Sequence, residues 1–370
     1  SAITPLVYFI LRFIDQSKVM TIFPIDAFAN DWSSHMARLF FLAKYGYHAI
    51  IPNWYASHSI LFQLYPPLWH HYALPWYYLL GNVPAAVFAA HITTYVLAAV
   101  AVVLICRQLK LSAAKTIAFF AFLFANPIAI GNFLRLGKVV ETFAWMIFLF
   151  LVFVLVSYRT RELDWKFYAG FIITLSLLFY AHLLVFIVSG IFVLGFLLSR
   201  NRKEIIKIIL AGFAVLAATA PHWINFVLNV KEFAVSSYTP LDRIISGAAY
   251  FDWLSSKIVP AAFIALLAIY LWQHHNEFYK KTMIFIPAAV AAALYFVGIL
   301  AKIPLLNRPN PDIYNTFFII LSIILLMSLN FKSFGRLRVA AYVTIILLPI
   351  AGVGISHAHT PYFQSHTQEL

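Results

Sequence analysis

The sequence predicts an all-α polytopic membrane protein, and three observations support that prediction. Hydrophobic residues make up 63% of the 370 residues, and the mean hydropathy is +0.86. Charged residues make up only 11% of the chain, whereas roughly a quarter of residues are charged in soluble globular domains. The apolar residues also gather in runs whose length suits helices that cross a bilayer. Together these observations exclude a soluble globular domain.

The apolar runs predict a bundle of about 11 transmembrane helices in a single membrane domain, residues 1–370. Several runs are shorter than the ~20 residues of a full span, so their ends are approximate. Because the chain opens at Ser1 inside an apolar run, we expect a first span that is truncated at its start. The runs lie at residues 1–14, 84–106, 115–131, 139–157, 167–181, 183–198, 205–225, 258–273, 282–301, 312–331 and 338–356.

Basic clusters between the runs predict which loops face the cytoplasm. The formal net charge of +13 would by itself suit a nucleic-acid-binding protein. The cations lie instead in short loops between apolar runs, as the positive-inside rule places them, so we exclude nucleic acid as a partner. The clusters are Arg107, Lys110 and Lys115; Arg159, Arg161 and Lys166; Arg200, Arg202, Lys203 and Lys207; Lys280 and Lys281; and Lys332, Arg336 and Arg338.

The opposite, extracytoplasmic face is predicted to carry most of the acidic residues. It has a long first outer loop at 15–82 with amphipathic or interfacial helices, a second at 126–141 and a long loop at 226–257. We therefore expect any chemistry on this face. The acids assigned to it are Asp15, Asp26, Asp31, Glu141, Glu232, Asp242, Asp252, Asp312 and Glu369.

Residues 58–81 of the first outer loop are apolar enough to resemble a further span. The Pro66-Pro67 pair and Pro75 interrupt a helix there, because proline removes a backbone donor and clashes with the preceding turn. A crossing would also place the first basic cluster outside, against the positive-inside rule. We therefore interpret the segment as interfacial or re-entrant, with a kinked span as the alternative.

Asp31, His35 and Arg38 are spaced to share one face of a helix in the first outer loop. Asp26 lies one short turn earlier. A carboxylate at a membrane surface, beside a histidine that can orient it, suits a general base for an alcohol nucleophile. The alternative is an amphipathic helix on the membrane with these groups in water.

The rest of the first outer loop and the second one supply candidate substrate-binding residues. Trp54 and Tyr65, the latter opening a Tyr-Pro-Pro-Leu turn, suit stacking on a sugar or an isoprenoid; an interfacial aromatic belt is the alternative. Arg135 and Lys138 suit a phosphate or diphosphate, with Glu141 beside them. The alternative for both cations is a snorkelling role with Glu141 as their partner.

Two further candidates lie in later outer loops. His182 interrupts an apolar run, and ionisable groups at membrane depth are costly, so it is a functional candidate; a neutral histidine bonded to a neighbouring helix is equally consistent. Arg308 is a second anion-binding candidate or a plain loop cation. Metal ligands are not predicted, because the paired histidines lack carboxylate or thiol company, and Cys106 is the only cysteine.

The order of these pieces resembles the GT-C superfamily of membrane glycosyltransferases. A first span precedes a long outer loop with Asp31 near its start and the Tyr-Pro-Pro-Leu turn later. The second outer loop has the form Pro-x7-Arg-x-Gly-x3-Glu, at Pro127, Arg135, Gly137 and Glu141. The chain is most similar to the branch labelled as related to 6-pyruvoyl-tetrahydropterin synthase, a label that implies no pterin chemistry. The resemblance covers the first 145 residues, and the remainder only by topology.

The resemblance implies transfer of a sugar from a polyprenyl-phosphate donor to an acceptor on the extracytoplasmic face. It makes Asp31 the first-loop carboxylate, which acts as base or orients the acceptor, and Glu141 the second-loop acid, which helps to hold the acceptor or a metal. We expect Asp31 to be the catalytic base, with His35 as its orienter. Many relatives carry paired acids, whereas Asn30 and Val140 precede the two acids here, so a divalent cation stays an open cofactor.

We further expect Arg135, Lys138 and Arg308 to bind the lipid phosphate. The alternative function is a non-catalytic integral membrane subunit of a larger complex, bound to a membrane protein partner, with a vestigial GT-C scaffold. A transporter ranks last, because we find no internal repeat and polar groups on one face only.

Overall fold

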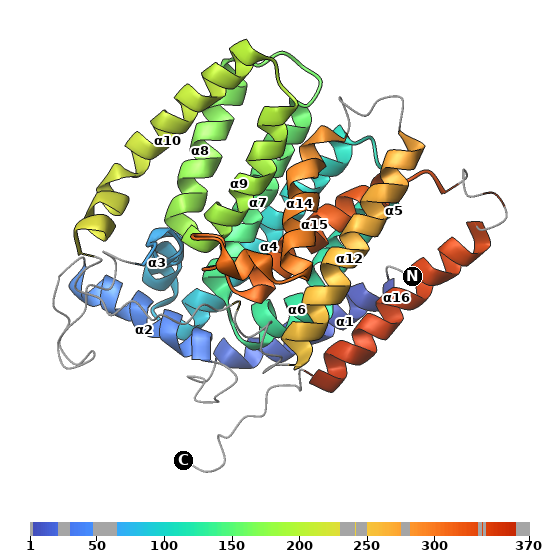
Figure 1. The fold of residues 1–370 in the computed structure, drawn as a ribbon. Coiled ribbons are helices and arrows are strands. Elements are labelled where there is room, and N and C mark those ends of the chain that lie inside the picture. Colours follow the sequence, from blue (N-terminus) through green and yellow to red (C-terminus); the bar gives the residue numbers. More distant parts are fainter. Residues whose placement is uncertain are drawn as a thin grey trace.

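The computed structural model describes residues 3–20, 30–46, 65–229, 241, 250–274, 282–331, 335 and 338–359. Within these ranges the regular structure consists of helices and contains no strand, which confirms the all-α prediction (Figure 1). The elements are α1 (Ile3–Gln16), η1 (Ser17–Met20), α2 (Asn30–Tyr45), α3 (Leu68–Leu80), α4 (Val83–Gln108), α5 (Ala113–Phe124), α6 (Pro127–Ala129), η4 (Ile130–Arg135), α7 (Val139–Ser157), α8 (Trp165–Ala181), α9 (Leu183–Leu198), α10 (Arg202–Asn229), α12 (Tyr250–Gln273), η7 (Met283–Phe285), α14 (Ile286–Phe296), η8 (Ile299–Lys302), α15 (Pro311–Ser328) and α16 (Arg338–His359).

Five helices among the described residues are long and apolar enough to cross a membrane: α4, α7, α10, α12 and α15. A sixth results if α5 and the α6–η4 segment, which are bent by 51° at the break between them, form one span. These helices fit a multi-pass membrane protein. The expected count of about 11 spans is not confirmed, because several apolar runs form shorter helices; α8 and α9 have 17 and 16 residues.

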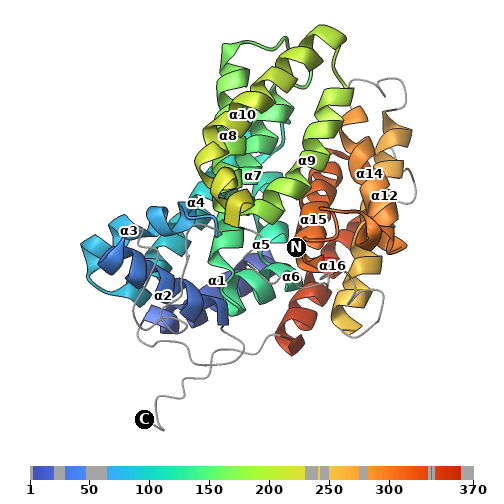
Figure 2. The same ribbon diagram turned by 60° about the vertical axis from the view of Figure 1, so that its left-hand side comes forward.

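The centre of the bundle is α7, whose sequence is apolar on every side beyond its first turn. In its span 83% of the residues are buried, against 22% for α10, which lies at the edge of the bundle. A helix that is hydrophobic all round belongs in a core, and α7 packs against α4, α8 and α9. On the other side α12, α14 and α15 pack together, as Figure 2 shows from a second direction.

The helices α1 and α2 lie across one end of the bundle (Figure 1). The apolar run at residues 1–14 forms α1, and its 14 residues extend about 21 Å, which is short of the ~30 Å hydrocarbon layer. It turns an apolar face outward, and Arg12, Asp15 and Gln16 are buried on the inner side. The exposed apolar side chains of α1 are Ile3, Val7, Ile10, Leu11 and Ile14.

Candidate active site

The helix α2 is fixed to the second predicted outer loop by Trp32. The Trp32 side chain is fully buried, and its Nε1–H donates a hydrogen bond to the carbonyl oxygen of Leu134 at 3.1 Å. The indole lies directly over Gly137, where an added Cβ would lie 2.0 Å from Trp32 Cδ1. Gly137 also has a φ of +73°, a conformation that glycine adopts without strain. Asp31, the residue before Trp32, is therefore held next to the segment that carries Lys138.

Four charged side chains from distant parts of the sequence meet at this place, and we call them the charge cluster: Asp31, Lys138, Glu141 and Asp312. The Lys138 ammonium donates a hydrogen bond to Asp312 Oδ2, and its Nζ is 4.0 Å from Glu141 Oε2. The carboxylate of Asp31 interacts electrostatically with Lys138 and Asp312. The cluster thus joins α2, the start of α7 and the start of α15.

The surroundings of the charge cluster favour a protonatable carboxyl at Asp31. Burial raises the pKa of Asp31, and the charge of Asp312 raises it further, while Lys138 and Arg38 oppose this rise. Burial alone would lower the pKa of Lys138, but the carboxylates of Asp312 and Glu141 outweigh it and raise that pKa. Lys138 therefore stays an ammonium group at neutral pH, whereas Asp31 holds a proton more readily than an aspartate in water.

A group of aromatic and histidine rings adjoins Asp31 along α2 and α3. The Arg38 guanidinium carbon lies 4.1 Å from the centroid of the Tyr65 ring, and burial raises the pKa of Tyr65 to about 12. The His35 ring centroid is 5.5 Å from those of Trp69 and His70. Burial, together with the charge of Arg38, lowers the pKa of His35 well below its usual range. His35 is therefore neutral at physiological pH.

His182 joins two helices beside the charge cluster. It ends α8 and begins α9, and its Nδ1 accepts a hydrogen bond from the Val185 backbone N–H at 3.4 Å. Burial lowers the pKa of His182 to about 4, an effect that Asp312 opposes and Lys138 reinforces. The ring is thus a neutral N-cap whose surroundings include two members of the charge cluster.

Other predicted site residues lie elsewhere. Arg135 is buried in η4. Arg308 is exposed in the turn before α15. Asp26 and Trp54 lie outside the described residues.

Asp312 was not predicted as a site residue, although the sequence carries a signal for it. It follows Pro311 at the start of an apolar run, in the first turn of α15. An acidic residue there is costly at membrane depth unless it has a partner. Glu141 occupies the matching place in α7, where its Oε1 accepts a hydrogen bond from Trp145 Nε1–H at 3.0 Å.

The described residues do not fit a divalent cation. Among them, no three His, Cys, Asp or Glu side chains are grouped as metal ligands. The Lys138 ammonium instead lies against the carboxylates of Asp312 and Glu141, where a cation bound by both would sit. We therefore derive no chemical step through a metal at this site.

The chain matches no protein-family model, no curated protein and no solved structure. The resemblance to GT-C enzymes therefore stays a prediction drawn from ordered residues of the sequence. What the site can do must be argued from the charge cluster itself. It combines a half-buried carboxyl of raised pKa with cations that suit an anionic substrate group.

Proposed function

We propose that the protein is a glycosyltransferase that moves a sugar from a polyprenyl-phosphate donor to an acceptor hydroxyl at the extracytoplasmic face. The observation that supports this proposal is the charge cluster, in which Asp31 of the first predicted outer loop meets Lys138 of the second. A carboxylate beside a cation, at one end of a membrane bundle, suits deprotonation of an alcohol next to a phosphate.

In the proposed reaction Asp31 is the general base. Its carboxylate accepts the proton of the acceptor hydroxyl while that oxygen forms a bond to the anomeric carbon of the sugar. The bond from that carbon to the donor phosphate oxygen breaks, and the polyprenyl phosphate leaves with the bonding electron pair. Because attack and departure occur on opposite faces, the configuration inverts. A raised pKa makes Asp31 a stronger base, since catalytic efficiency is best when the pKa approaches the working pH.

The cations that act on Asp31 are Lys138 and Arg38, so the proposal assigns phosphate binding to them. Positive groups held in place stabilise the charge that develops on a departing phosphate. Glu141 positions Lys138, since one of its oxygens accepts from Trp145 and the other faces the ammonium. Neutral His35 lies one helical turn from Asp31 and orients the acceptor rather than adding charge.

The test is the replacement Asp31→Asn, assayed by transfer of a radiolabelled sugar from a polyprenyl-phosphate donor in proteoliposomes that hold the full chain. Loss of a general base costs on the order of 10²-fold or more in rate. Glu162→Gln, an exposed acid between α7 and α8, is the control and should keep full activity. Near-normal transfer by a folded D31N protein would remove Asp31 from this role.

The pH profile gives a second readout for the same assay. The base works only when it is deprotonated, so the rate falls as the pH drops through the pKa of Asp31. Because burial raises that pKa, the acid limb of the profile should lie above the usual range of an aspartate. A profile without an acid limb in this region would contradict the assignment.

A second candidate function is a non-catalytic membrane subunit, and one observation favours it. Lys138 is already paired with Asp312 and lies near Glu141, so the charge cluster is also a closed ion-pair network that joins α7 to α15. In this alternative the cluster only holds the bundle together. Co-purification with a stoichiometric membrane protein, and no turnover by the isolated chain, would select it.

A further inference from the structure

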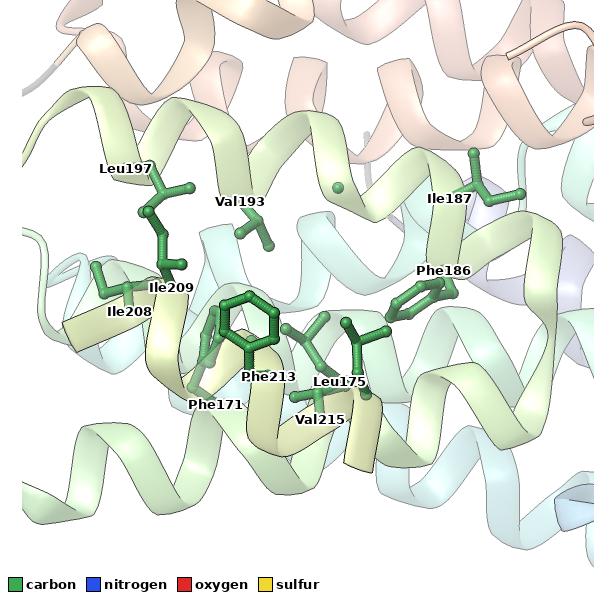
Figure 3. Close-up of a pocket in the computed structure, with 13 residues that line it drawn as sticks. Phe171, Leu175, Phe186, Ile187, Val193, Leu197, Ile208, Ile209, Phe213 and Val215 are labelled. Carbon is green, nitrogen blue, oxygen red and sulfur yellow. The ribbon is translucent and has the colours of Figure 1, made fainter. Parts of the chain in front are cut away.

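A cavity of about 430 Å³ lies among α8, α9 and α10, and none of the four charge-cluster residues lines it. Figure 3 shows its lining side chains. All its lining residues are apolar or glycine. They include Phe171 and Leu175 of α8, Phe186 and Leu197 of α9, and Phe213 of α10. The volume falls in the range of small-molecule pockets, which is ~300–1,000 Å³. A lining without polar groups suits a hydrocarbon chain.

The cavity lies beside α9, which packs on η7 and α14. Gly195 brings α9 against the backbone of η7, so closely that an added Cβ would lie 2.0 Å from the carbonyl oxygen of Ile284. α10 packs on α8. Between the two helices, Gly190 and Gly212 have nothing within 4 Å of an added Cβ. Three glycines therefore open a groove between α9 and α10 with α8 as its floor.

The groove opens toward the outside of the bundle. The side chains of Phe213 and Ile209 line it and are 62% and 49% exposed. Since α10 is long and apolar enough to cross a membrane, we infer that these side chains face hydrocarbon rather than water. An empty apolar groove forfeits dispersion contacts, so a lipid chain that fills it gains them.

One end of the groove carries a positive charge. Leu197 and Ile209 lie at that end, next to the short turn that joins α9 to α10. Arg202, the first residue of α10, is exposed and precedes Ile209 and Phe213 by 7 and 11 residues, which places the three on one helical face. The acid of this turn, Glu204, is paired with Arg200 at 3.6 Å.

We propose that this groove binds one acyl chain of an anionic glycerophospholipid, with the lipid phosphate beside Arg202. Basic pockets between transmembrane helices on the cytoplasmic side bind anionic headgroups. The positive-inside rule predicts that side for the α9–α10 turn. The phosphate of the proposed sugar donor would lie at the other end of α9, near His182 and the charge cluster. The lipid site therefore does not depend on the proposed function.

The experiment is a lipid titration followed by native mass spectrometry of the full chain in mild detergent. The probes are palmitoyl-oleoyl-phosphatidylglycerol and the zwitterionic palmitoyl-oleoyl-phosphatidylcholine. Gly212→Leu fills the groove, and folding is retained because leucine favours the helix more than glycine does. Arg202→Gln removes the headgroup contact. A thermal melt of each variant checks the fold.

Two variants serve as matched controls. Gly354→Leu adds the same side chain at an open glycine of α16, where nothing lies within 4 Å of an added Cβ. Lys207→Gln removes an exposed cation that lies about 140° round α10 from Arg202, at 3.6 residues per turn. Both should bind each lipid as the wild type does.

The wild type should retain one phosphatidylglycerol more tightly than phosphatidylcholine. Arg202→Gln should weaken phosphatidylglycerol about fivefold and leave phosphatidylcholine unchanged, since one cation near a headgroup contributes about 1 kcal/mol. Gly212→Leu should abolish this bound lipid. Unchanged binding in Gly212→Leu would overturn the groove as the site. Weakening of both lipids by Gly212→Leu with no effect of Arg202→Gln would overturn the anionic headgroup.

Discussion

Replacing Gly137 with alanine tests how α2 is held on the segment that carries Lys138. The added methyl group would enter the space of the Trp32 indole, 2.0 Å from its Cδ1. The indole cannot withdraw freely, because it is fully buried and donates a hydrogen bond to Leu134. The substitution should therefore displace Trp32 and, with it, Asp31.

The expected loss of stability has three parts. A φ of +73° costs an alanine about 1 kcal/mol, since the left-handed region crowds Cβ against the next carbonyl. Overpacking a buried side chain costs about 1–3 kcal/mol. Loss of the hydrogen bond from Trp32 to Leu134 costs about 1 kcal/mol more. Together Gly137→Ala should destabilise the protein by about 3–5 kcal/mol.

Gly81→Ala measures the backbone strain by itself. Gly81 has a φ of +64°, and nothing lies within 4 Å of an added Cβ there, so alanine meets strain but no clash. The measurement is the free energy of unfolding in mixed micelles, by far-UV circular dichroism, for both variants. The loss in free energy of unfolding should be about 2–4 kcal/mol larger for Gly137→Ala than for Gly81→Ala, which is the sum of the clash and the lost hydrogen bond. It should also lower the rate of the proposed transfer.

A double-mutant cycle then decides the cause. With Trp32→Ala both the clash and the hydrogen bond are already absent, so Gly137→Ala should cost about 2–4 kcal/mol less in that background. Strict additivity of the two substitutions, or a Gly137→Ala effect no larger than that of Gly81→Ala, would refute the view that this contact positions Asp31.

Three further predictions concern other contacts. Lys138→Met should lower the free energy of unfolding by about 1–3 kcal/mol, because it leaves the half-buried Asp312 carboxylate without its partner. Adding Asp312→Asn should recover part of the loss, and a double variant no more stable than the single one would argue against the pair. His182, whose pKa is lowered from 6.5 to about 4, is protonated first in the unfolded chain, so stability should fall by roughly 1.4 kcal/mol per pH unit between about pH 6.5 and 4. His182→Asn keeps an N-cap without this titration, and an equal slope in both proteins would contradict the reasoning. Gly195→Ala should lose about 1–3 kcal/mol in chemical denaturation whereas Gly190→Ala gains about 0.5–1; similar changes at both sites would count against the α9–η7 contact.

The apolar runs predict the long helices well but not the broken ones. The runs at 84–106, 139–157 and 312–331 lie close to α4, α7 and α15. The run at 115–131 is interrupted instead, because Asn126 caps a new helix and Pro127 opens it. That Asn-Pro pair is a recognisable local signal for a helix start. A mean hydropathy taken over about 20 residues does not detect it.

The site was predictable within one helix but not across the fold. The spacing of Asp31, His35 and Arg38 places them on one face of α2. In the structure each of these three side chains has an interaction partner on that face. The meeting of Asp31 with Lys138 and Asp312 depends on packing between segments more than 100 residues apart. Residue spacing contains no information on such distances.

The junction at His182 has a consequence for how the protein is made. With 17 and 16 residues, α8 and α9 are each about 25 Å long, which is less than the ~30 Å that a lone helix must cover. α8 alone is therefore too short to span the hydrocarbon layer. Only His182 separates the two helices. We therefore expect the two helices to enter the bilayer together, as one hairpin.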